Sequence, residues 1–260
     1  MKFTGKNVSI GRNVLIGKNV KIGDNTTIYD NVEIGDNSII SNNCVLGEPL
    51  SNYYVDDDYV NPKLIIGPNS LIRSHNIFYA GSKFGANLQT GHFVTIREFT
   101  ECGSNCLIGT HSDIQGFCKL GNYVRLHSYV IVGQKSQVGN FVFIYPFVVL
   151  TNDPTPPSND IAGVHIEDYA QIAAASVLLP DTFIGENCLI SANSTVGGKF
   201  PGDSFIMGSP AKRVGCLSKM PFFNSEGKRH YPWQKNFERG MPWQGIGYDK
   251  WLNLKNQKND

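Results

Sequence analysis

The stretch IGRNVLIGKNVKIGDNTTIYDNVEIGDNSIISNNCV, residues 10–45, repeats one six-residue pattern without a slip. Each unit opens on an aliphatic residue, often followed by glycine, and has a small or β-branched residue at its fifth position. The register resumes at Ile66 and holds to Leu150, then resumes at Ile166 and runs to Val196. We count 28 such hexads, of which 24 begin with Ile, Leu or Val. Self-similarity of this kind indicates a solenoid.

The hexad also predicts the shape of the solenoid. Its first and fifth residues must both point inward, which describes a short strand followed by a corner where Gly or Asn tolerates a positive φ. Three corners close a triangular coil, and stacked coils lie ~4.8 Å apart, as neighbouring strands do. The sequence therefore predicts an all-β protein, a parallel β-helix of about nine coils.

The pattern resembles that of the hexapeptide-repeat, left-handed β-helix acyltransferases, [LIV]-G-x-x-[STAVC]-x, over about residues 8–215. The resemblance implies a left-handed coil. We divide the chain into a β-helix domain, residues 1–215, and a small, partly helical C-terminal appendage, residues 216–260. All three tryptophans lie in the appendage, where we expect the aromatic side chains to pack on the prism or on a neighbour.

Composition sets broad limits on the class of protein. The formal net charge is +1, from 23 basic and 22 acidic residues, which gives no case for a nucleic-acid partner. The start of the sequence lacks a secretory signal, and no apolar run approaches the ~18 residues of a membrane span. We expect a cytoplasmic protein with no membrane partner.

The cysteines follow the repeat. Four of them occupy the inward fifth slot and Cys102 occupies a first slot, so we interpret them as small buried hydrophobic residues; the four are Cys44, Cys106, Cys118 and Cys188. The sequence has no C-x-x-C, and we expect neither a disulfide framework nor a metal site.

Two insertions break the register, at residues 48–63 and 152–165. They are either surface loops or loops that lean over a neighbouring subunit's cleft, and we favour the second interpretation because the register is otherwise strict. The helix closes on P-G-x-x-x-x-x-G-x-P-A-K, which resembles the closing signature of coenzyme-A-dependent members of the group. The resemblance implies that this segment binds coenzyme A. The alternative is that it forms a solvated basic turn. The implied coenzyme-binding residues are Gly208, Ser209, Pro210, Ala211, Lys212 and Arg213.

Hexads three apart stack on one face, and one face collects histidines from consecutive coils: His75, His92, His111 and His127. On that face Thr90 interrupts the aliphatic ladder. A buried polar residue is costly unless it is hydrogen-bonded, so we expect a functional departure there. The next face carries Tyr79, Arg97, Glu98, Glu101 and Gln115.

The segment QTGHFVTIRE, residues 89–98, together with LGEP and TNDPTPP at the insertions, resembles the nucleotide-sugar N-acyltransferases of the group. That resemblance implies a homotrimer with active sites between subunits. It implies transfer from acetyl-CoA or a longer acyl-CoA to the amine of a nucleotide-linked, dTDP- or UDP-type, amino-deoxy sugar. The chain departs from branches with a catalytic His in an HDC hexad, because the corresponding unit here is IQGFCK.

The amine must be neutral to attack, and an imidazole titrates in the right range to take its proton. We expect His92 to hold or deprotonate the amine, with His127 and His111 next, and Glu101 or Glu98 as alternatives that orient it. The leaving thiolate could instead take the proton. The substrate-binding candidates are Asn76, Tyr79, Thr90, Arg97, Glu98 and Asp113.

Three alternatives stay open. O-acylation of a sugar or amino acid is the nearest. A metal enzyme of the γ-carbonic-anhydrase type shares the prism and the closing signature. Such an enzyme would need two histidines close together in one turn region, and this sequence lacks such a pair. A non-catalytic scaffold is less compatible with the polar face and the two insertions.

Overall fold

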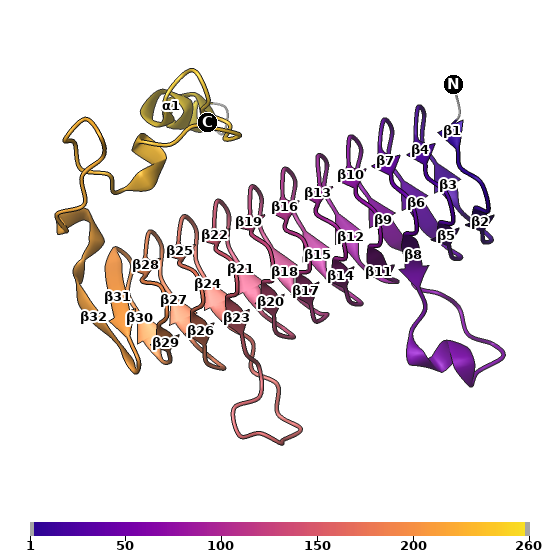
Figure 1. Cartoon of the computed structure of the whole chain (residues 1–260), viewed down its shortest axis with the longest axis horizontal. Coiled ribbons are helices and arrows are strands. Elements are labelled where there is room, and N and C mark those ends of the chain that lie inside the picture. Colours follow the sequence, from indigo (N-terminus) through magenta and orange to yellow (C-terminus); the bar gives the residue numbers. More distant parts are fainter. Residues whose placement is uncertain (1–2, 258–260) are drawn as a thin grey trace.

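The computed structural model describes residues 3–257 and shows a parallel β-helix with three sheets running along its length (Figure 1). Sheet A consists of β1 (Phe3–Thr4), β4 (Lys21–Ile22), β7 (Ile39–Ile40), β10 (Leu71–Ile72), β13 (Gln89–Thr90), β16 (Leu107–Ile108), β19 (Arg125–Leu126), β22 (Phe143–Ile144), β25 (Gln171–Ile172), β28 (Leu189–Ile190), β31 (Ser204–Gly208) and β32 (Ala211–Cys216).

Sheets B and C have ten strands each. Sheet B consists of β2 (Ser9–Ile10), β5 (Thr27–Ile28), β8 (Val45–Glu48), β11 (Ile77–Tyr79), β14 (Thr95–Ile96), β17 (Asp113–Ile114), β20 (Ile131–Val132), β23 (Val149–Leu150), β26 (Val177–Leu178) and β29 (Thr195–Val196). Sheet C consists of β3 (Leu15–Ile16), β6 (Val32–Ile34), β9 (Leu64–Ile66), β12 (Lys83–Phe84), β15 (Glu101–Cys102), β18 (Lys119–Leu120), β21 (Gln137–Val138), β24 (His165–Ile166), β27 (Phe183–Ile184) and β30 (Lys199–Phe200).

The fold class is as predicted, but nine coils is too few. Sheet A alone contains eleven parallel strands, followed by the antiparallel β32. The hexad count began at Ile10 and ended at Val196, whereas β1 precedes this range, and β30 and β31 follow it. These end strands lack a clean hexad signature, so the pattern underestimates the length.

We name the turns by the sheets they join: corner AB leads from sheet A to sheet B, and corners BC and CA follow the same rule. The fourth residue of each hexad that runs directly into the next has a positive φ, and in the first coils it is Asn, as in Asn7, Asn25 and Asn43. These side chains form a ladder; Asn7 Nδ2 donates to Asn25 Oδ1 at 3.1 Å.

Glycine recurs at the second hexad position for a different reason from the predicted need for a positive φ. These glycines do not need positive φ; they leave room for the next coil. A Cβ on Gly121 would lie 2.7 Å from the carbonyl carbon of Gly139, closer than atoms pack. The positive φ falls instead on the fourth residue, where Asn tolerates it.

The first and fifth hexad positions form one continuous core, as predicted. The five cysteines assigned to these slots are buried, and all six cysteines are free thiols. Burial raises the pKa of the Cys118 thiol to about 11. That pKa keeps the thiol protonated and inert at neutral pH.

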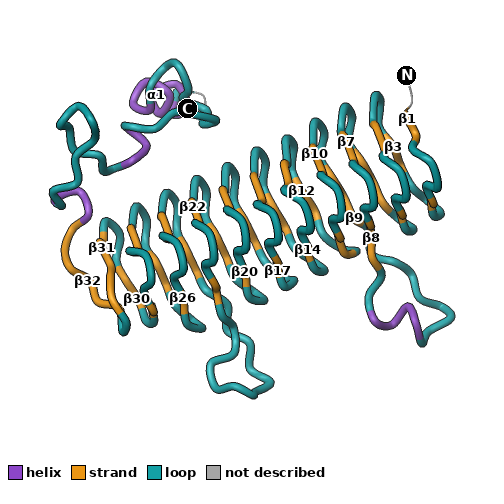
Figure 2. The backbone as a smooth tube through the Cα atoms, viewed as in Figure 1, coloured by secondary structure: helices purple, strands orange, loops and turns teal. Residues whose placement is uncertain are grey.

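Both insertions leave the prism from corner BC and project on the same side (Figure 1). The first follows β8 and contains a short 3-10 helix, η1 (Ser51–Tyr54); the second lies between β23 and β24. After β32 the chain forms η2 (Leu217–Lys219), η3 (Trp233–Lys235) and α1 (Tyr248–Asn256). Figure 2 shows these helices in purple against a prism of strands and turns.

The appendage runs back beside the prism, as Figure 1 shows, and packs its aromatic side chains on corner CA. Trp243 is fully buried and its ring lies 5.2 Å from that of Phe141. Trp233 Nε1 donates to the Tyr169 carbonyl at 2.9 Å. The expectation that the tryptophans pack on the prism is therefore confirmed.

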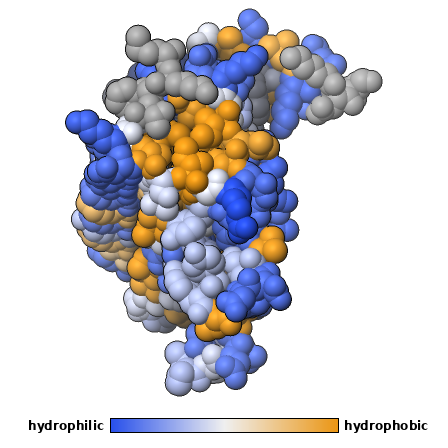
Figure 3. Space-filling model, turned by 90° about the vertical axis from the view of Figure 1, so that its right-hand side faces the viewer, coloured by the Kyte–Doolittle hydropathy of each residue, from blue (hydrophilic) through white to orange (hydrophobic). Residues whose placement is uncertain are grey.

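Apolar side chains are also exposed at the N-terminal end of the prism. Figure 3 views this end and shows apolar side chains gathered on it. Ile10, Leu15 and Ile16 are each more than two-fifths exposed. No helix between residues 3 and 257 is long and apolar enough to cross a membrane.

Two buried threonines give a matched test of core polarity. Thr90 Oγ1 accepts hydrogen bonds from Asn76 Nδ2 and the Arg73 amide, whereas the buried Thr100 Oγ1 has no partner. We predict that Thr90→Val lowers the free energy of unfolding by about 1–3 kcal/mol, because two donors are orphaned. Thr100→Val should be neutral or stabilising. Chemical denaturation measures both; equal effects would contradict this account.

Candidate functional site

Four histidines lie at corner AB in consecutive coils, in the turns after β10, β13, β16 and β19, as the register predicts: His75, His92, His111 and His127. The four turns are neighbours ~4.8 Å apart along the corner, but the histidines occupy the fourth, third, fourth and second hexad positions, so their rings are not stacked directly on one another. The corner is one border of sheet B.

Two of the histidines belong to a column of rings. His75 stacks on Phe93 with centroids 4.6 Å apart, and Phe93 stacks on His111 at 5.0 Å. Tyr129 and Phe147 continue the column at 5.0 Å per step. All five residues have a positive φ, as do the fourth residues of the other coils, although this conformation is less favourable for bulky side chains than for Asn. The aromatic residues replace the asparagines of the first coils only in this central part.

The other two histidines have distinct polar settings. Ser74 Oγ lies 2.8 Å from His92 Nδ1, which fixes the orientation of that exposed ring. His127 stacks on Tyr145 with centroids 4.7 Å apart. Burial lowers the pKa of His127 from its ordinary value of 6.5, because desolvation disfavours the imidazolium. His127 is therefore a neutral imidazole at physiological pH and can accept a proton.

Across sheet B, corner BC holds the other polar group. The Arg97 guanidinium donates two hydrogen bonds to Glu98, at 2.9 and 3.0 Å, and lies over the Tyr79 ring at 5.5 Å. The Glu98 side chain is only 10% exposed, so this is a partly desolvated, bidentate pair and not a loose surface contact. Asp113 lies on β17 between the two corners and accepts a hydrogen bond from Gln115 Nε2 at 3.4 Å.

Asn76 and Thr90, which we expected to bind substrate, are not exposed on the surface of the prism. Both are fully buried. Asn76 Nδ2 donates to Thr90 Oγ1 at 2.6 Å, and Asn76 Oδ1 accepts from the Val94 amide at 2.7 Å. The buried Thr90 hydroxyl, which interrupts the aliphatic ladder, and the Asn76 amide therefore satisfy each other inside the prism.

Glu101, expected as an alternative group that orients the amine, lies apart from the histidines of the same chain. It lies on β15 of sheet C, on a different face from corner AB. Its neighbours in the strand register are Lys83 and Lys119. The sequence interpretation placed Glu101 with Glu98, but the third and sixth positions of one hexad lie on opposite sides of a corner.

The closing hairpin of β31 and β32 turns at corner AB, beyond the histidines. Ser209 Oγ donates to Thr195 Oγ1 at 2.9 Å, and the Gly208 amide donates to Ser194 Oγ at 3.2 Å, so the turn is fixed to sheet B. Arg213 Nε donates to Ser204 Oγ at 2.8 Å. Lys212 is exposed beside this turn. The signature therefore presents Lys212, while Arg213 is held against the hairpin.

A cavity under the second insertion escaped the sequence interpretation. It has a volume of about 630 Å³ and lies between the Pro-rich loop and the last turns of corner BC; its lining includes Pro154, Leu179, Gly197 and Gly198. Gly197 directly follows β29, whose first residue Thr195 contacts the closing turn. The sequence signals for this cavity were the loop TNDPTPP and the adjacent Gly197 and Gly198. Their proximity is visible only in the fold.

Comparison with family models matches the bacterial transferase hexapeptide, six repeats, at residues 13–48 and the hexapeptide repeat of succinyl-transferase at residues 182–198. These two segments lie near opposite ends of the β-helix. Both segments therefore carry the hexapeptide repeat that these models describe. A search of curated proteins gives no match.

Several solved structures are similar to this hexapeptide-repeat protein. Neisseria gonorrhoeae serine acetyltransferase is 28% identical over 42% of this chain and 42% of its own, with a TM-score of 0.38. Arabidopsis UDP-N-acetylglucosamine acyltransferase is 18% identical over 98% and 86%, with a TM-score of 0.43. PerB from Caulobacter crescentus, in complex with CoA and GDP-perosamine, is 15% identical over 56% and 57%, with a TM-score of 0.35.

The chain spans less than half of the serine acetyltransferase. At these TM-scores the likeness does not extend to the placement of a site. Within residues 3–257 of the hexapeptide-repeat protein, no group of three or more His, Cys, Asp or Glu side chains is arranged to hold a metal ion.

The setting of His127 predicts a pH dependence of stability. Its pKa is below 6.5 in the folded state, so the unfolded chain binds more protons as the pH falls through 6.5. The contribution of His127 to the free energy of unfolding should therefore be largest above pH 6.5. Below pH 6.5 the free energy of unfolding should decrease, by at most ~1.4 kcal/mol per pH unit from this residue. Denaturation at several pH values should give His127→Gln a shallower decrease than wild type; identical slopes would contradict the prediction.

Proposed function

We propose that this hexapeptide-repeat protein is an acyl-CoA-dependent N-acyltransferase. The acceptor is the amino group of a nucleotide-linked amino-deoxy sugar, with dTDP as the nucleotide. The amine nitrogen attacks the thioester carbonyl and forms the C–N bond of a tetrahedral adduct. The adduct loses a proton from nitrogen and collapses with cleavage of the C–S bond, and coenzyme A leaves as the thiol once that proton reaches its sulfur. The acyl group is acetyl or longer.

The observation that carries the proposal is the continuity of corner AB between His127 and the closing hairpin. Two of the three turns between them are built from small residues: Ala173, Ala174 and Ala175 after β25, and Ser191 and Ala192 after β28. The first turn, after β22, carries Tyr145, which stacks on His127, and Phe147. The hairpin lies four coils beyond His127, about 19 Å at ~4.8 Å per coil. An extended coenzyme fits such a narrow path, with its phosphates at Lys212 and its thioester toward the histidines.

The neutral His127 supplies the base. An imidazole with a lowered pKa accepts a proton from the tetrahedral adduct and returns it to the thiolate. His92, oriented by Ser74 at 2.8 Å, holds the incoming amine. His111 is packed between Phe93 and Tyr129 and contributes a wall to the site. This ordering moves His127 ahead of His92 as the proton acceptor.

Across sheet B, the Arg97–Glu98 pair offers both signs of charge to a nucleotide sugar. The guanidinium suits phosphate oxygens, and Tyr79 beneath it offers a ring face to the base or sugar. Asp113 lies midway between the two corners, within reach of sugar hydroxyls. We further propose a homotrimer, in which a neighbouring prism covers this open face and completes the site.

A thiol-release assay tests the reaction. Purified protein is given acyl-CoA donors with dTDP- or UDP-linked amino-deoxy sugars, and free coenzyme A is measured. We expect release that requires the amino sugar, and His127→Gln should lower kcat/KM by roughly 10²–10⁴ as expected for loss of a general base. Release with hydroxyl acceptors alone would instead indicate O-acylation.

The coenzyme site has its own prediction. Lys212→Gln should raise the KM for acyl-CoA about tenfold with kcat little changed, because one charge-assisted contact to phosphate is lost in both ground and transition states. Lys219→Gln, an exposed lysine of η2 beyond the hairpin, is the matched control and should leave KM unchanged. Equal effects of the two variants would remove the closing hairpin from the coenzyme site.

A further inference from the structure

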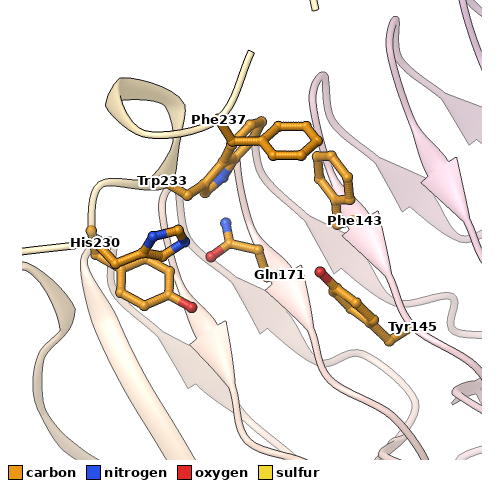
Figure 4. Close-up of a pocket in the computed structure, with 7 residues that line it drawn as sticks. Phe143, Tyr145, Gln171, His230, Trp233 and Phe237 are labelled. Carbon is orange, nitrogen blue, oxygen red and sulfur yellow. The ribbon is translucent and has the colours of Figure 1, made fainter. Parts of the chain in front are cut away.

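A second pocket lies on the other side of corner AB, between sheet A and the appendage (Figure 4). Phe143 and Tyr145 belong to the prism, while Tyr231, Trp233 and Phe237 come from the appendage. Its volume is about 90 Å³. That volume admits water and the edge of a ring, but not a whole benzene-sized molecule.

The decisive feature is the side chain of Gln171. It is only 6% exposed and lines the pocket, and its Oε1 has no hydrogen-bond partner. Figure 4 shows its amide among the aromatic rings, with the Tyr145 hydroxyl pointing toward it. A buried acceptor left unpaired costs about 1–3 kcal/mol, so it marks a place where a partner belongs.

The orientation of this amide is fixed by its neighbour. Gln171 Nε2 donates to the Tyr169 carbonyl, which also accepts from Trp233 Nε1 at 2.9 Å. Turning the amide over would set Oε1 against that carbonyl and lose the hydrogen bond. The pocket therefore presents an acceptor and demands a donor from its ligand.

The surroundings decide which donor. The lining carries no carboxylate, and a cation would leave its remaining N–H groups unpaired beside one amide oxygen. A hydroxyl needs only one acceptor. The Tyr145 and Tyr231 hydroxyls and the His230 ring supply further polar atoms around the aromatic faces. Aromatic faces with a few hydroxyl-binding groups suit the edge of a sugar ring, apolar on its C–H face and polar around its rim.

We propose that this pocket is a carbohydrate-binding site, in which a hydroxyl of a monosaccharide ring donates to Gln171 Oε1 and the ring edge packs on Tyr145 and Trp233. The pocket adjoins the proposed acyl-transfer site, because Tyr145, which lines the pocket, also stacks on His127 at 4.7 Å; Gln171 and the appendage residues take no part in that transfer. The carbohydrate-binding site goes beyond that function and does not depend on it.

Binding can be measured on the full chain without coenzyme or nucleotide sugar. Free D-glucose, D-galactose, L-fucose and L-rhamnose are titrated while the tryptophan fluorescence is followed, since Trp233 borders the pocket, and the shift in Tm is recorded. At least one sugar should change the fluorescence and raise Tm. No response to any of the four would overturn the proposal, whatever the outcome of the thiol-release assay.

The chain provides a matched pair of variants. Gln171→Met keeps the shape of the side chain but removes the acceptor, and should raise Kd about tenfold, as for loss of one hydrogen bond. Gln234→Met is the control: Gln234 is equally buried and its Oε1 is also unpaired, but it does not line the pocket. Equal Kd values for both variants would overturn the assignment to Gln171. Binding of tetramethylammonium in place of the sugars would overturn the carbohydrate assignment.

Discussion

The backbone hydrogen bonds between successive coils are the constraint on which the rest depends. The amide of Gly11 donates to the carbonyl of Ile28 at 2.8 Å, and the same step repeats along all three sheets. Each repeat fixes the strand register at 18 residues, as between Leu107 and Arg125. Side chains of equal hexad position are therefore stacked, so that any residue type recurring at one slot becomes a ladder in space. Asparagine, aromatic and core ladders all arise in this way.

This regularity explains what the sequence could predict. Position in the hexad decides burial, so the core, the free cysteines and the histidines at corner AB were predictable from spacing alone. The two insertions were equally visible, because they interrupt the register. The number of coils was not predictable, because the end strands depart from the hexad pattern. β1 has Thr4 and β30 has Phe200 where the pattern expects an aliphatic residue, and the spacing from the preceding coil to β30 and β31 is shortened.

The site was less predictable because it depends on contacts between ladders. Thr90 looked like a functional departure, yet its partner Asn76 sits 14 residues earlier in the neighbouring coil. Nor does the spacing show that burial lowers the pKa of His127 or that its ring stacks on Tyr145. The pocket at Gln171 requires the path of the appendage, which has no repeat to predict it.

The 18-residue coil also limits how the length of this protein can change. Removing or adding one hexad turns every later residue by a third of a coil, which would carry the closing hairpin from corner AB to another edge and separate it from His127. Removing or adding three hexads changes only the distance between them. Within the repeats, the number of residues can therefore change only in multiples of 18 without moving the hairpin to another corner. Insertions of other lengths are tolerated in loops at a corner, such as residues 49–63 and 151–164.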